Sequence, residues 1–506
     1  MLKYKKEGLY IIYTLFILIL IINCQNKTEQ LDLLGQNIKS KKLDQVTLTF
    51  YIIGKEHPEL RSVLDVIENQ TRKELNIKLD FKFFNGISSI NYFKNIINAK
   101  LPCDAFTISS WTNTSLLKYL YTKNYIIDLT ELMPVYAPDY YQKFTYKDLE
   151  LMMTENKLLA IPNRFYLSSR NCAIIRDDLW QEYNIKKIET YDELEEFLEL
   201  IKQNESDYIP LATNDNTLGL FAEYFGYVIF NKQLSLVYKY NDPAMKIMAW
   251  EQTPEYRKSL QIIHRWIHKG YYLKNFFNIE PDKRIVAKGN WAVFVSTQGT
   301  ALQFNRWTSE LNETFRYIEI PLYPDKISMR TIPFNNCLVI SKNSKNPERI
   351  IMFIEWLNKN RRNYDLLHYG IKAKHFNLKG DQYTIPGETA INKSFCNWQG
   401  RQVFINMNLE RTHISTSKNY QKKTLKGIQQ NSVFAPHLGF TMNYYSLMDL
   451  VNIRSKDLRE NDGKLGKSKY SDKKIDEYIN YHKKNGVDKL ANAVQEQLDL
   501  WRKNYK

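Results

Sequence analysis

Glycine and proline are scarce in this chain, with 18 and 15 residues among 506. Such low numbers exclude a collagen-like repeat and a long flexible linker. Hydrophobic residues make up 43% of the chain and charged residues 25%, which is ordinary for globular proteins and excludes an intrinsically disordered one. The length corresponds to about three units of average domain size.

Long apolar segments are equally rare, because the sequence has one, near the N-terminus. A polytopic membrane protein, which needs several, is therefore excluded. Three lysines precede an uncharged run of 14 residues, Leu9–Ile22. A bilayer needs about 20 residues, so this run fits the apolar region of a signal peptide better than a membrane span. We expect a signal peptide over residues 1–23.

The apolar run ends at Cys24, and polar residues follow it. This pattern resembles the lipobox of bacterial lipoproteins, in which the cysteine is lipidated and becomes the first residue of the mature protein. Asn23 departs from the small residue that is usual before that cysteine. We expect lipidation at Cys24 and a tether over residues 24–45. An uncleaved signal anchor stays open, and both interpretations place the folded part outside the cytoplasmic membrane.

Motifs of common enzyme classes are missing from the sequence. It contains no GxGxxG, no GxxxxGK[ST] and no GxSxG pattern. His264 and His268 have the spacing of a zinc-binding helix, but Arg265 stands where a zinc protease has glutamate. Cys103, Cys172, Cys337 and Cys396 show no metal-ligand spacing and are expected to be free, buried thiols. We therefore expect no enzyme activity, no cofactor and no metal.

The formal charge of +16 comes from 71 basic and 55 acidic residues. A basic balance is compatible with nucleic-acid binding, with an anionic membrane surface or simply with solubility. The lysines are spread along the chain, and the densest patch, Lys467–Lys484, lacks the arginine and glycine–aromatic pattern of nucleic-acid readers. We therefore expect no nucleic-acid partner.

Strand and helix patterns alternate after the tether. Residues 46–53, 77–84 and 105–108 are predicted strands, and residues 60–75 and 90–99 are predicted helices. The order βαβαβ predicts a doubly wound parallel sheet, in which ligands bind beyond the carboxyl ends of the strands. Ser109, Ser110 and Trp111 stand at such an end.

A second series of elements follows. The segment 158–163 contains a predicted strand that stops at Pro162, and another predicted strand covers 172–176. Thr190 and Glu193 form a capping box before the predicted helix 191–203. The remaining predictions are the strands 291–295 and 336–340 and the helices 256–269, 347–358, 475–483 and 487–503.

Short segments in a fixed order resemble one family, the extracellular solute-binding lipoproteins of bacterial ABC importers, of the carbohydrate type. The segments are Val46–Tyr51, Cys103–Trp111, Asn156–Pro162, Arg176–Leu179 with Thr190–Leu194, Lys288–Val293 and Ser341–Pro347. Leu367–Ile371, Lys374-His375 and Asn485–Lys489 are similar to the LipO-like subgroup and its C-terminal domain of unknown function. Asn156 and Ala373 depart from the glycines of the family.

The resemblance implies an α/β fold of the type II periplasmic-binding-protein kind. Two α/β lobes are joined by a hinge, with a ligand cleft between them and a helical C-terminal extension. The implied boundaries are lobe 1 over 46–163, lobe 2 over 164–316, and a hinge return with the second segment of lobe 1 over 317–360. Residues 361–506 are expected to complete lobe 2. The crossings are expected near 162–165 and 317–333.

The resemblance also implies a function, which is capture of a small-molecule solute for delivery to ABC permease subunits. It further implies a lipid-anchored monomer at the extracytoplasmic face of the cell membrane. The aromatic content of 14% permits a carbohydrate or oligosaccharide, while a peptide or another polar solute stays open. An exported carbohydrate hydrolase and a ligand-presenting sensor for a membrane kinase are the alternatives. The expected ligand-binding residues are Ser109, Ser110, Trp111, Asn163, Arg164, Tyr166, Ser296, Thr297 and Gln298.

Overall fold

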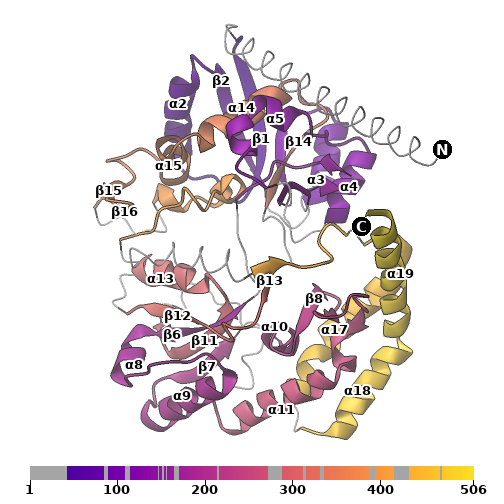
Figure 1. Ribbon diagram of the computed structural model, residues 1–506. Coiled ribbons are helices and arrows are strands. Elements are labelled where there is room, and N and C mark those ends of the chain that lie inside the picture. The colour runs from indigo at the N-terminus through magenta and orange to yellow at the C-terminus, as the bar shows by residue number, and fades with distance from the viewer. Residues whose placement is uncertain are drawn as a thin grey trace, which may run out of the picture.

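Two separate sheets, each with its own hydrophobic core, divide the protein into two lobes (Figure 1). The structure is a computed structural model. It describes residues 43–84, 89–108, 114–145, 148–150, 153–154, 156–164, 170–213, 216–271, 286, 288–310, 315–330, 336–387, 394–414, 432–440, 442–467 and 470–505. Within these ranges, no helix has an apolar stretch sufficient to cross a bilayer.

Lobe 1 is built on a sheet with the strand order β14-β3-β1-β2. Strands β1 (Val46–Ile53), β2 (Ile77–Phe84) and β3 (Ala105–Ile108) are parallel, which confirms the predicted parallel sheet. Strand β14 (Cys337–Ile340) adds to β3 in the antiparallel direction. Successive residues of β1 are buried on both faces, because helices supply a core on each side of a parallel sheet.

Three helices of lobe 1 were expected from their apolar spacing. They are α2 (Leu60–Thr71), α3 (Ser89–Asn98) and α14 (Pro347–Asn358). Their buried residues join those of the sheet in a single hydrophobic core. Burial of this apolar area is the main stabilising contribution to the lobe.

Lobe 2 is built on a sheet with the strand order β12-β6-β11-β7. Strand β11 (Trp291–Thr297) lies between β6 (Asn171–Arg176), which is antiparallel to it, and β7 (Ile209–Thr213), which is parallel. Strand β12 (Tyr317–Pro321) pairs with the outer side of β6. The sheet is therefore mixed, whereas that of lobe 1 is parallel except at one edge.

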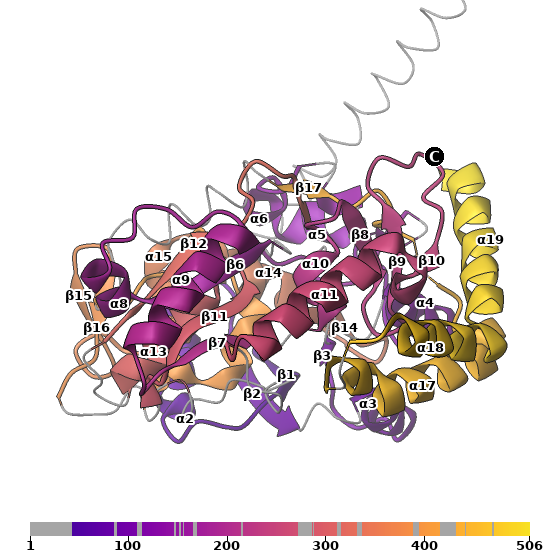
Figure 2. The same ribbon diagram turned by 90° about the horizontal axis from the view of Figure 1, so that it is seen from below.

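Helices α9 (Tyr191–Asn204) and α11 (Pro254–His268) lie side by side over the lobe 2 sheet (Figure 2). The indole nitrogen of Trp266 donates a hydrogen bond to Glu195 across the pair, at 3.1 Å. The predicted capping box is confirmed, because the Thr190 hydroxyl accepts from the Glu193 amide and the Glu193 carboxylate accepts from the Thr190 amide.

The C-terminal helices α17 (Met448–Lys467), α18 (Asp472–Lys484) and α19 (Val487–Tyr505) flank lobe 2. With the small sheet of β8 (Tyr227–Asn231), β9 (Leu236–Lys239) and β10 (Met248–Ala249), helices α17 and α19 enclose a further apolar cluster. A buried ion pair between Arg454 and Glu251, at 2.7 Å, ties α17 to this side of the lobe.

One predicted boundary is wrong, because two segments of the expected lobe 2 region 361–506 pack in lobe 1. Leu366 and Leu367 of α15 (Arg361–Tyr369) lie in the lobe 1 core, together with Phe395, Trp398, Val403 and Phe404. There the Trp398 indole stacks on Phe81 and donates a hydrogen bond to the carbonyl oxygen of Leu367 at 2.7 Å. Apolar periodicity shows that a helix has a buried face, but it does not show which sheet that face meets.

The expected hinge return near 317–333 begins too early. Residues 317–321 form β12 in the lobe 2 sheet, so the chain has not yet left that lobe. Strand β13 (Ser328–Arg330) follows and pairs with β17 (Ser432–Phe434). The return to lobe 1 therefore lies between Arg330 and Cys337. The first crossing lies between Arg164, which pairs with Asn406 in lobe 1, and the start of β6.

The four cysteines outside the signal region are free and buried, as the sequence predicts. Burial raises the pKa of the Cys103 and Cys337 thiols to about 12. These thiols therefore stay protonated and unreactive in the folded protein.

Trp398→Ala is expected to lower the free energy of unfolding by about 3–5 kcal/mol, because it removes a buried indole from the lobe 1 core. Urea denaturation measures the change. Leu500→Ala is the control, since this side chain is 62% exposed on α19 and its loss should cost less than about 0.5 kcal/mol. Equal effects of the two substitutions would contradict the assignment of residues 395–404 to the core.

Candidate solute-binding site

All four strands of the lobe 2 sheet have one end at the same edge of the sheet, and this edge lies next to the crossings. The register pairs Thr297 with Asn171, Val295 with Thr213, and Pro321 with Cys172. The chain enters lobe 2 at this edge, just before Asn171, and leaves it after β12. In lobe 1 the returning chain enters β14 at Cys337, opposite Ile108 at the carboxyl end of β3. The two strand-end edges are therefore the parts of the sheets nearest the hinge, where ligands of α/β proteins bind.

Ser296, Thr297 and Gln298 lie at this edge of lobe 2. The Ser296 hydroxyl is buried and accepts a hydrogen bond from Thr300 at 3.2 Å. The backbone amide of Gln298 donates to the carbonyl oxygen of Arg170 at 3.0 Å. The side chains of Thr297 and Gln298 are half-buried. These three residues were selected because ligands of α/β proteins bind beyond strand ends, and the structure places them beside the first crossing. Their contact with a ligand stays a prediction.

Asn163 and Arg164 fasten the crossing segment to lobe 1. The Asn163 amide nitrogen donates to the carbonyl oxygen of Asn336 at 3.2 Å, and the Arg164 guanidinium donates to that of Lys143 at 3.0 Å. The Arg164 guanidinium also lies 5.8 Å from the centre of the Phe144 ring. These contacts position the start of the first crossing, and a ligand role for either residue stays a prediction.

Ser109, Ser110, Trp111, Tyr166 and Cys24 lie outside the described residues. Ile108, the last residue of β3, precedes the first three directly and pairs with Cys337.

Sequence reasoning missed Arg170 and Asn171. The Asn171 amide nitrogen donates to the carbonyl oxygens of Gly219 and Leu220, both at 2.9 Å. Its Oδ1 atom is buried and accepts no hydrogen bond from any described residue. A buried amide oxygen without a partner is costly in a folded protein, so this atom is a candidate acceptor for a ligand hydroxyl. The signal was available, because both residues directly precede the predicted strand 172–176.

Arg170 organises the loop that follows β12. Its buried guanidinium donates hydrogen bonds to the carbonyl oxygens of Leu322, Tyr323 and Lys326, the first at 3.2 Å. The Tyr323 hydroxyl in turn accepts from the backbone amide of Tyr191 at 2.7 Å, and burial raises the pKa of this hydroxyl. One arginine at the first crossing thus holds the segment that leads to the second.

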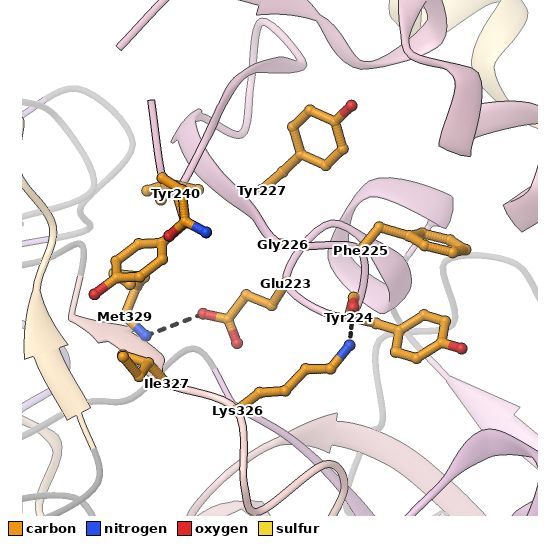
Figure 3. A pocket seen from close by; sticks show the side chains of 11 residues that line it. Glu223, Tyr224, Phe225, Gly226, Tyr227, Tyr240, Lys326, Ile327 and Met329 are labelled. Carbon is orange, nitrogen blue, oxygen red and sulfur yellow. Dashed lines mark hydrogen bonds between the residues drawn. The ribbon is translucent and has the colours of Figure 1, made fainter. Parts of the chain in front are cut away.

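A second feature missed by the sequence is a hollow of about 510 Å³ beside this loop (Figure 3). We call it the lobe-2 hollow. The Glu223 carboxylate points into it and accepts a hydrogen bond from the amide of Met329 at 3.2 Å. The Lys326 ammonium donates to the carbonyl oxygen of Tyr224 and lies 4.4 Å from the centre of its ring. The lining residues are 223–228, 240–241, 326–327 and Met329.

Within the described ranges, no three His, Cys, Asp or Glu side chains are placed to hold an ion together. His264 of the spaced histidine pair lies against the Tyr470 ring, with 5.5 Å between ring centres. The edge presents the side-chain amides of Asn171 and Gln298 and the hydroxyl groups of Ser296 and Thr297, and the adjoining hollow is lined by tyrosine rings, Glu223 and Lys326. Such a set suits recognition of a polar organic molecule by hydrogen bonds.

No family model matches the chain. A protein of Streptococcus pneumoniae serotype 4 (strain ATCC BAA-334 / TIGR4), named carbohydrate ABC transporter substrate-binding protein, is 23% identical over 490 residues, which cover 92% of each chain. The crystal structure of the N-glycan transport solute binding protein NgtS from Streptococcus pneumoniae aligns with a TM-score of 0.72 and 19% identity, over 91% of this chain and 100% of that one. The chain has the fold of ABC-importer solute-binding proteins. The resemblance drawn from the sequence motifs is thus confirmed.

A further solved structure extends the comparison. The substrate binding protein FusA of a Streptococcus pneumoniae ABC transporter, in complex with kestose, aligns with a TM-score of 0.60 and 16% identity, over 91% of this chain and all of the other. Alignment over nearly the whole length of both chains shows that the two lobes and the C-terminal helices form one shared architecture.

Arg170→Met is expected to lower the free energy of unfolding by about 1–3 kcal/mol, because three carbonyl oxygens lose their donor at a buried position. Arg257→Met is the matched control. Arg257 forms ion pairs with Asp472 and Asp476 at the surface, and their loss should cost about 0–1 kcal/mol. Urea denaturation of both variants measures the difference, and a smaller loss for Arg170→Met than for the control would refute the fastening role.

Proposed function

We propose that this protein captures a carbohydrate, most simply an oligosaccharide, outside the cell and delivers it to the permease of an ABC importer. The observation that carries the proposal is the solute-binding fold, in which each of two separately packed lobes has one strand-end edge next to the crossings. The similar proteins are a carbohydrate substrate-binding protein, NgtS in complex with Man1GlcNAc or Man5GlcNAc, and FusA in complex with kestose.

Binding would work by closure of the two lobes on the solute. Each lobe keeps its own core, so a rotation about the crossings repacks little apolar surface. The solute binds the closed arrangement better because only there do both edges contact it. This differential affinity is what shifts the population toward closure, and the closed form is what a permease would recognise.

The proposed ligand-binding residues combine the expected set with Asn171, which the structure adds. A sugar offers hydroxyl groups to polar side chains and an apolar ring face to aromatic side chains. Thr297, Gln298 and Asn171 supply the polar groups in lobe 2, and Trp111 is the proposed stacking residue in lobe 1. The other members remain Ser109, Ser110, Asn163, Arg164, Tyr166 and Ser296.

Lipid anchoring belongs to the same proposal. The apolar run before Cys24, and the polar tether after it, suit a lipoprotein held at the extracytoplasmic face of the membrane. The tether would let a monomer reach its permease while it remains concentrated near the membrane. No chemical step is assigned to the protein, since its relatives are substrate-binding proteins.

The binding prediction is tested by thermal denaturation in the presence of neutral oligosaccharides of increasing length. A sugar present at about 100 times its dissociation constant stabilises the folded protein by about 2.7 kcal/mol and raises the melting temperature. The same mixtures are then analysed for cleaved sugar. Stabilisation without cleavage is the expected result, whereas cleavage products would favour the hydrolase alternative and contradict the proposal.

Cys24→Ala is expected to release the protein from the membrane fraction, because the substitution removes the residue that would carry the lipid. Cell fractionation and immunoblotting measure the distribution. Replacement of Cys103 by Ala is the control, since this buried thiol has no role in anchoring. Retention of the Cys24→Ala protein in the membrane, as tightly as wild type, would show that the N-terminal segment is a transmembrane anchor instead.

A further inference from the structure

The lobe-2 hollow is the middle part of a longer track along the surface of lobe 2. Toward the crossings it shares Glu223, Tyr224 and Lys326 with a small hollow that is also lined by Arg170 and Asn171. In the other direction it shares Tyr240 and Asn241 with a hollow of about 360 Å³ that reaches α19. The track therefore begins at the strand-end edge proposed to bind the solute and continues away from it.

The lining of the track alternates aromatic rings with hydrogen-bonding groups. Figure 3 shows the Tyr240 and Tyr224 rings on opposite sides of the Glu223 carboxylate, with Lys326 beside them. The Tyr224 ring is held in place by contact with Tyr323, at 4.4 Å between ring centres. Rigid tyrosines next to a carboxylate can bind sugar units by ring stacking and by hydrogen bonds to hydroxyls.

The charged side chains of the two larger hollows are balanced in number. Glu223 and Lys326 line the lobe-2 hollow, and Asp242 and Arg502 line the hollow beyond it. Arg170 adds a positive charge at the start, but its guanidinium is already engaged by three backbone carbonyl oxygens. The two larger hollows carry no net charge, which favours a neutral ligand over an acidic one, because an anionic chain would meet a carboxylate in each of them.

We propose that this track binds the outer units of a neutral oligosaccharide whose first units lie between the lobes. The inference rests on the proposed function, since it needs a sugar at the strand-end edge. It adds that affinity depends on chain length, because only a longer glycan extends from Asn171 past Tyr224 to Tyr240. The volume of the lobe-2 hollow falls within the range of roughly 300–1,000 Å³ that is typical of small-molecule sites.

Two variants test the track without altering the strand-end edge. Tyr240→Ala removes a ring from the lobe-2 hollow, and Asn241→Trp obstructs the exposed junction with the next hollow. Asn452→Trp, at an exposed position of α17 outside the track, is the matched control. Melting temperatures of the unliganded variants are recorded first, so that any loss of affinity can be separated from a loss of folding.

Affinities are measured by calorimetry with neutral gluco-, manno- and fructo-oligosaccharides in series from the disaccharide upward, and with an acidic uronate oligosaccharide. Wild type is expected to bind the longer members of one neutral series more tightly. Tyr240→Ala and Asn241→Trp should each weaken the long members by about tenfold and leave the short members unchanged, while the control binds as wild type.

The possible failures are distinct from one another. If wild type binds none of the sugars, the proposed function itself is refuted. If wild type binds a short sugar but gains nothing from added units, or if both variants keep wild-type affinity for the long members, the track is not a sugar subsite. Tighter binding of the uronate series, lost in the same variants, would overturn the assignment of a neutral ligand.

Discussion

The antiparallel pairing of β14 with β3 is the constraint on which the rest of the molecule depends. The lobe 1 sheet is completed by residues 337–340, which the chain reaches only after it has built the lobe 2 sheet. The polypeptide must therefore cross between the lobes and return. Because β14 enters the sheet opposite the carboxyl end of β3, the crossings lie at the strand-end edges. The position of the proposed solute site thus follows from the topology.

Hydrogen bonds also connect the segments that cross between the lobes. Arg170, at the end of the first crossing, binds the loop that leads to β13, and β13 pairs with β17 about 100 residues later in the chain. Segments far apart in sequence are thereby joined at the base of lobe 2. Since the two lobes keep separate cores, these connections define the axis about which one lobe could move against the other.

Much of the framework could be predicted from the sequence, because its elements have strong periodicity and clear ends. Strand β1 has the predicted bounds Val46–Ile53, and α9 follows the predicted capping box at Thr190. Arg176, the first residue of the segment Arg176–Leu179 that resembles the solute-binding family, has a structural role. Its guanidinium lies 4.0 Å from the centre of the Phe315 ring and donates a hydrogen bond to the carbonyl oxygen of Gly289. Strands β7 to β10 were not predicted.

The site was less predictable because it depends on contacts between distant segments. The expectation that ligands bind beyond carboxyl strand ends selected Ser296, Thr297 and Gln298, whose ligand role stays a prediction. It passed over Asn171, which is at the amino end of β6 and lies beside Thr297. The lobe-2 hollow joins residues near 225, 240 and 327, and no local pattern in any of these segments indicates that they meet. In the same way, nothing in the sequence of residues 361–404 shows which of two cores they complete.

Closure of the lobes on a sugar is the central claim, and a distance between lobes tests it most directly. Spin labels on Leu101→Cys in lobe 1 and Leu200→Cys in lobe 2 occupy exposed positions, and the buried native thiols leave the introduced ones to react once Cys24 is replaced by Ser. Pulsed dipolar spectroscopy would then compare the protein with and without a saturating sugar. The account predicts a shorter label–label distance when sugar is bound. An unchanged distance, with binding verified by calorimetry in the same sample, would contradict it.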